Sequence, residues 1–79
     1  MTNKYFIIRY NTSGNEYITV LLEKTEEYQK FQIISNHIQT YGGYNRAGDI
    51  CFVHKDAIHV KVKEELSEEF IEQLLLTLL

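Results

Sequence analysis

The sequence predicts one small α+β domain over residues 1–79, with a four-stranded, mainly antiparallel sheet and two helices. The predicted order of elements is strand-strand-helix-strand-strand-helix. Three observations favour this fold class. The chain is short enough for a single core. Apolar and polar residues alternate in two pairs of segments that flank turns, and each pair is followed by a helix-capping residue with two glutamates after it.

The first hairpin is predicted over residues 4–10 and 16–23, which alternate as strands do. The turn cluster Asn11-Thr12-Ser13-Gly14-Asn15 separates them, and Gly14 can adopt a positive φ. Alternation divides the apolar side chains between two faces. The set predicted to face the core consists of Phe6, Ile8, Tyr10, Ile18, Val20 and Leu22.

The first helix is predicted to begin at Thr25 and to end at Gly42-Gly43. Threonine caps helix N-termini, and Glu26 and Glu27 would lie at the positive end of the helix dipole. The apolar residues after them recur at spacings of three and four, which is typical of one helix face. These residues are Tyr28, Phe31, Ile34, Ile38 and Tyr41.

A second hairpin is predicted over residues 49–54 and 58–63, around a turn at Lys55-Asp56. A two-residue turn would place one alternating set in the core. A three-residue loop, which is the less favoured alternative, would invert the first of these strands and bury His54. The predicted core set is Cys51, Val53, Ile58, Val60 and Val62.

The second helix is predicted to begin after Ser67, which has the side chain of an N-cap. Leu66 and Ile71 stand at the positions of a hydrophobic staple across this helix start. The segment 25–28 also aligns with the segment 67–70, since both read as a cap, two glutamates and an aromatic residue. A duplicated strand-strand-helix unit would explain that match, and so would two independent helix caps.

Charge and hydropathy exclude several classes of function. The net charge of −3 gives no field that would attract a polyanion. No segment resembles a leader peptide or is long enough to span a bilayer, so we expect a cytoplasmic protein that does not act on a membrane. A single cysteine excludes an internal disulfide. Residue types with A/T-rich codons outnumber glycine, alanine, arginine and proline, which favours an A/T-rich bacterial, phage or plasmid origin.

The spacing of the reactive residues predicts neither an enzyme nor a cofactor. The three serines fall in a turn, inside a helix and at a helix cap. The second hairpin would bring His54 and His59 together on its outer face, but a zinc ion needs further ligands and Cys51 would point to the opposite face. The sequence therefore predicts no metal site, and Cys51 is interpreted as a buried apolar residue.

The loop between the first helix and the second hairpin is a candidate ligand site. It combines glycines, aromatic residues, an arginine and an acid, which suits a small anion or a nucleotide. It leaves a helix and enters a strand, however, so the helix N-terminus that usually binds phosphate is missing. The candidate ligand-binding residues are Tyr41, Tyr44, Asn45, Arg46 and Asp49.

The face of the sheet opposite the predicted core is too apolar for a surface that only meets water. An exposed patch of this kind usually marks protein association, and a homodimer would bury it. Helices on both faces of the sheet would be an alternative cover. The candidate partner-binding residues are Tyr5, Ile7, Tyr17, Leu21, Ile50 and Phe52.

These observations favour a small, non-enzymatic protein-binding or regulatory module, such as a phage or mobile-element protein that inhibits a larger host protein. The alternative is a small-ligand-binding protein that uses the loop of residues 41–49. Nucleic-acid binding through Phe52 and the lysines of the second hairpin is less favoured, because the chain is acidic overall.

Overall fold

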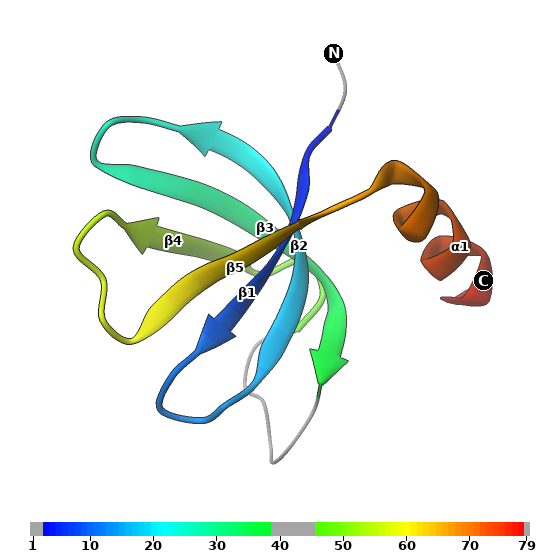
Figure 1. Ribbon diagram of the computed structural model, residues 1–79, viewed down its shortest axis with the longest axis horizontal. Coiled ribbons are helices and arrows are strands. Elements are labelled where there is room, and N and C mark those ends of the chain that lie inside the picture. The colour runs from blue at the N-terminus through cyan, green and yellow to red at the C-terminus, as the bar shows by residue number, and fades with distance from the viewer. Residues whose placement is uncertain (1–2, 39–45, 79) are drawn as a thin grey trace.

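The computed structural model describes residues 3–38 and 46–78, which form a curled antiparallel sheet and one helix (Figure 1). The sheet bends into a half-barrel with a concave inner face and a convex outer face. The elements are β1 (Tyr5–Tyr10), β2 (Glu16–Lys24), β3 (Tyr28–Ile38), β4 (Ile50–His54), β5 (Val60–Leu66) and α1 (Glu68–Leu78).

The five strands lie in the order β4-β3-β2-β1-β5, and every neighbouring pair is antiparallel. The predicted fold class is therefore wrong in two respects: the sheet has five strands instead of four, and the described residues contain one helix instead of two. The second predicted hairpin is also wrong. Although β4 and β5 follow one another in sequence, β4 pairs with β3 and β5 pairs with β1, at opposite edges of the sheet.

The first hairpin is confirmed as two paired strands with the predicted turn between them. Gly14 lies in that turn with a φ of 77°, a left-handed conformation that glycine adopts without steric cost. The register places Ile7 opposite Ile18 and Phe6 opposite Thr19. Phe6 therefore shares the inner face with Tyr17, Thr19 and Leu21. The predicted place of Ile18, Val20 and Leu22 on that face is wrong.

The predicted first helix is wrong, because β3 occupies most of its range. The local signal at Thr25 nevertheless corresponds to real hydrogen bonds: the Thr25 hydroxyl accepts from the backbone N–H of Glu27 and of Tyr28, each at 3.1 Å. The backbone N–H of Thr25 also donates to the Tyr28 carbonyl at 2.8 Å, which closes a tight turn between β2 and β3. The side chain that would cap a helix stabilises a hairpin turn instead.

The core lies inside the half-barrel and draws side chains from every strand. Aromatic rings meet edge to face within it, with ring centroids 5.8 Å apart for Phe6 and Phe31 and also for Tyr10 and Tyr17. Ile58, predicted to be in the core, is 84% exposed and lies in the connection between the end of β4 and the start of β5. The buried cluster consists of Ile8, Tyr17, Phe31, Ile33, Cys51, Val53 and Val60.

The convex face carries a second, smaller set of buried residues. Ile7 and Ile18 face each other across β1 and β2 on this side, and both are buried. Ile71 of α1 is buried as well. In Figure 1 this helix lies beside the sheet, beyond the end of β5.

The start of α1 is confirmed at Ser67. Its hydroxyl accepts a hydrogen bond of 3.1 Å from the backbone N–H of Phe70, and a cap of this kind stabilises a helix by about 1 kcal/mol. The duplicated strand-strand-helix unit is wrong, because the segment that would match α1 is a strand. Among the described residues, no helix has the length and apolar character needed to cross a membrane.

Candidate binding surfaces

The edge strand β4 has one side paired and one side open. The Ile33 N–H donates to the Asp49 carbonyl at 2.9 Å, and the Lys55 N–H donates to the Glu27 carbonyl at 2.8 Å. Because hydrogen-bonding direction alternates along a strand, the backbone groups of Cys51 and Val53 point toward β3 as well. The N–H and C=O groups at the intervening positions 50, 52 and 54 therefore point away from β3, and of these the His54 carbonyl already accepts a hydrogen bond of 2.9 Å from the Ala57 N–H.

Two large apolar side chains stand on the outer face of the same strand. Phe52 is 55% exposed and Ile50 is 45% exposed. On β3, Tyr28 packs edge to face against Phe52 with ring centroids 5.5 Å apart, and the Lys30 ammonium lies 5.7 Å from the centre of the Phe52 ring. More than half of Phe52 stays exposed despite these contacts. We call the group Tyr28, Lys30, Ile50, Phe52 and His54 the β4 edge surface.

Tyr28 adds an anchored polar group to this surface. Its hydroxyl is hydrogen-bonded to the Glu23 carboxylate, and that hydrogen bond is the main reason that the pKa of Tyr28 is raised. The phenol therefore remains a neutral hydrogen-bond donor at neutral pH.

The two edges of the sheet differ in charge. β5 contains two lysines and two glutamates, whereas β4 contains no lysine, arginine, aspartate or glutamate. Charged side chains on an edge strand discourage pairing with another chain, and an uncharged apolar edge permits it. By this criterion β5 is a protected edge and β4 is an unprotected one.

The predicted partner-binding residues do not share one face. Ile50 and Phe52 are exposed on the outside of β4, but Tyr17 and Leu21 lie on the concave side, where Tyr17 is buried and Leu21 packs against the core. Tyr5 and Ile7 lie on the convex side, and Ile7 is buried there. The prediction that these six residues lie on one face is therefore wrong. A binding role for those that are exposed stays a prediction.

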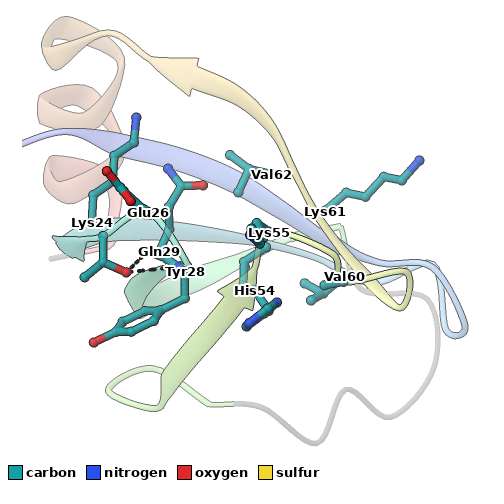
Figure 2. Close-up of a pocket in the computed structure, with 12 residues that line it drawn as sticks. Lys24, Glu26, Tyr28, Gln29, His54, Lys55, Val60, Lys61 and Val62 are labelled. Carbon is teal, nitrogen blue, oxygen red and sulfur yellow. Dashed lines mark hydrogen bonds between the residues drawn. The ribbon is translucent and has the colours of Figure 1, made fainter.

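A cavity of about 460 Å³ opens at one end of the half-barrel (Figure 2). It lies between the β2–β3 turn and the segment that runs from the end of β4 into β5. Its apolar lining comes from Val53, Ala57, Val60 and Val62. The sequence could not indicate this cavity, because it depends on residues 24–29 forming a turn and not a helix.

The polar rim of the cavity is partly neutralised. Glu26 adds a carboxylate to the lining. Lys55 of the lining is paired at 3.6 Å with Glu27, whose carboxylate also lies 3.9 Å from the imidazole of His54. Lys61 also contributes to the lining, but Figure 2 shows its side chain extending away from the β2–β3 turn. Lys24 at the opposite rim has no ion pair among the described contacts.

The predicted ligand loop lies mostly outside the described residues, including Tyr41, Tyr44 and Asn45. Its last two candidates form a turn: the Asp49 carboxylate accepts from the Arg46 N–H at 2.7 Å, and the Asp49 N–H donates to the Arg46 carbonyl at 3.0 Å. Gly48 in this turn has a φ of 95°. The Asp49 carboxylate therefore has a structural role at the entrance to β4.

A buried acid on the convex side is also explained by structure. The Glu16 carboxylate is hydrogen-bonded to the Lys63 ammonium at 2.8 Å and lies 3.7 Å from the Arg9 guanidinium. These three residues tie β2, β1 and β5 together across the sheet. The cluster is consistent with a structural clamp and offers no open carboxylate for chemistry.

The described residues do not bring together a metal site from three histidine, cysteine or acidic side chains. The predicted neighbourhood of His54 and His59 is wrong, because β4 and β5 do not pair. His54 lies opposite Tyr28, and the His59 carbonyl accepts a hydrogen bond from Asn11 near β1. The pair that suggested a shared ion is therefore split between the two edges of the sheet.

Cys51 is buried in the core, as predicted, and is hydrogen-bonded to the Tyr10 hydroxyl at 3.0 Å. Burial raises the pKa of the Cys51 thiol, and the hydrogen bond with Tyr10 offsets this only in part. The folded state thus disfavours the thiolate. This contribution to stability is complete below the ordinary thiol pKa of about 8.5 and is lost as the pH rises above it.

We expect native Cys51 to react with iodoacetamide at least about 100-fold more slowly than the urea-unfolded chain, because the thiol is both buried and protonated. The measurement is the alkylation rate, followed by mass spectrometry between neutral and mildly alkaline pH. The unfolded chain at each pH is the control. Native and unfolded rates within a few-fold of each other would contradict the burial of this thiol.

Comparisons with protein-family models, with curated proteins and with solved structures find no match for this chain, so its function is inferred from the geometry of the β4 edge surface and the cavity.

Proposed function

We propose that the protein is a non-enzymatic protein-binding module that holds its partner at the β4 edge surface. One observation carries the proposal: an uncharged edge strand exposes Ile50 and Phe52 beside a row of outward-pointing backbone groups. Backbone groups of this kind pair with an added strand, and apolar side chains next to them supply contact area. Aromatic residues that remain exposed on a small domain are enriched at protein interfaces.

A regulatory role in the cytoplasm is the form of this proposal that we favour. The small size and the A/T-rich codon preference suit a phage or mobile-element protein that acts on a larger host protein. The one cysteine is free, which suits a reducing compartment. Inhibition would then result from occupying a surface of the target and would require no catalytic group.

The test is site-specific photo-crosslinking in cells of the source organism. Phe52 is replaced by the photoreactive analogue benzoylphenylalanine, and crosslinked products are identified by mass spectrometry. The matched control carries the same analogue at Ile58, which is 84% exposed but lies outside β4. We expect position 52 to crosslink to a protein, and we expect that same protein to be missing from the products crosslinked at position 58. Identical adducts at both positions, or no adduct at position 52, would contradict the proposal.

Binding of a small anionic ligand is the second candidate function, and the cavity favours it over the loop of residues 41–49. Its volume of about 460 Å³ lies in the range of small-molecule sites. Apolar side chains form part of its lining, which also includes Lys24 and Glu26. A ligand held there would raise the melting temperature of the wild type more than that of Lys24→Ala. If the protein instead binds a partner at the β4 edge surface, the two melting temperatures should respond equally to added small anions.

A further inference from the structure

We infer that the partner of the β4 edge surface is a second copy of this chain, bound by antiparallel pairing of the two β4 strands around a two-fold axis at Phe52. This inference rests on the proposed function, because it names the protein that the edge binds. Three features of the strand support it: its hydrogen-bonding register, the side chains that this register brings together, and the charges at the two ends of the strand.

The register follows from the backbone groups that point away from β3. They belong to Ile50, Phe52 and His54, and an antiparallel hydrogen-bonded pair must join two residues of this kind. A two-fold axis at Phe52 pairs Phe52 with itself and Ile50 with His54 of the second copy. The Phe52 groups, the Ile50 carbonyl and the His54 N–H then find open partners, and the Ile50 N–H shares the His54 carbonyl with the Ala57 N–H. Shifting the strands by two residues leaves one of the three outside the paired strands. The self-paired register therefore uses the open edge most completely.

The same register extends the apolar surface across the axis. The two Phe52 rings lie next to each other on the outer face, and each Ile50 side chain lies next to His54 of the second copy. On the inner face Cys51 lies opposite Val53, which continues the buried row of each half-barrel. No formally charged side chain of either β4 strand is placed against a like charge, because the strand contains none.

The residues that flank β4 make the edge complementary to itself. In this register Asp49 of each copy lies opposite Lys55 of the other, and the symmetry places one such pair at each end of the ladder. Both residues are exposed. Their backbone groups point toward β3, so each pair is of the non-hydrogen-bonded type, in which opposing side chains lie closest. Antiparallel pairing with a second copy therefore adds the Asp49 carboxylate of that copy to the intrachain partner of Lys55, which is Glu27.

The strand is short, so the expected dimer is weak. β4 has five residues, and an interface of this length falls below the area of permanent dimers. We expect a dissociation constant in the micromolar range. Sedimentation equilibrium of the wild type, from low micromolar to near-millimolar concentration, measures it. Phe52→Glu should weaken the dimer by at least about 10-fold, because it would place two carboxylates on the axis.

A charge-swap series tests the register independently of Phe52. Lys55→Glu would place a second carboxylate against Asp49 at both ends of the ladder and should weaken the dimer by about 5- to 10-fold. Adding Asp49→Lys to that variant restores opposite charges and should recover most of the loss. Ile58→Glu is the control that should leave the dissociation constant unchanged. Circular dichroism and the melting temperature of each variant establish that it is folded.

The outcomes separate this inference from the proposed function. A wild-type dimer that is weakened by Phe52→Glu and Lys55→Glu, and restored by the double variant, supports the inference. A wild type that stays monomeric at near-millimolar concentration overturns it, as does a dimer insensitive to both substitutions. If the chain is monomeric but position 52 crosslinks a different protein, the inference fails and the proposed function stands. If neither occurs, both fail.

Discussion

Replacing Phe31 with alanine is expected to lower the free energy of unfolding by about 3–5 kcal/mol. Phe31 is completely buried and lies in β3, between β2 and β4. Its ring packs edge to face against Phe6 at 5.8 Å, so the substitution removes apolar burial and an aromatic contact and leaves a cavity. A domain of this size has a total stability of about 5–15 kcal/mol, so a large share of it would be lost.

Urea unfolding followed by circular dichroism measures this loss. Phe31→Leu keeps most of the volume and should retain a measurable folded baseline if the alanine variant unfolds. The matched control is Phe70→Ala on α1, where the same atoms are removed from a side chain that is 41% exposed. Equal losses at the two positions would contradict a core built around β3.

Tyr17→Ala is the second substitution with a large expected effect, again about 3–5 kcal/mol of stability. Tyr17 is buried on the concave side of β2, and its ring meets Tyr10 edge to face at 5.8 Å. On the exposed face that the sequence predicts for it, the same substitution would leave stability nearly unchanged and would affect only association. The loss of stability measured for Tyr17→Ala therefore shows whether Tyr17 faces the core or the exposed face.

Tyr5→Ala is the control for this experiment. Tyr5 lies on the convex side of the neighbouring strand and is only partly buried. We expect its removal to cost clearly less stability than removal of Tyr17, as measured by the urea midpoint at equal slope. A reversed order of the two variants would show that the register of the first hairpin is shifted by one residue.

The parts of the fold that could be predicted from sequence are those fixed by neighbouring residues. The Gly14 turn joins two strands that are adjacent in the chain, and Ser67 caps the helix that follows it directly. The segment after Thr25 could not be assigned in this way. Its hydroxyl bonds the same backbone groups in a hairpin turn as in a helix cap, and pairing of β3 with strands on both sides outweighs the local helix signal.

The candidate site was predictable only in part, for a related reason. Once Cys51 and Val53 are assigned to the core, alternation alone exposes Ile50 and Phe52, and the structure agrees. In β2, however, both alternating sets are apolar, so alternation could not decide whether Tyr17 faces inward. That choice depends on packing against strands distant in sequence. The open edge of β4 could not be predicted either, since its sequence neighbour β5 looked like its pairing partner.

The place of β5 in the sheet also determines the order in which the chain can fold. Strands β1 to β4 form a meander in which each strand pairs with the next, so their contacts close short loops. β5 instead pairs with β1, the strand farthest from it in sequence, and closing that long loop is slow. During synthesis the meander can assemble while its β1 edge still lacks a partner. Docking of β5 then completes the buried cluster with Val60, and we expect it to be the committing step of folding.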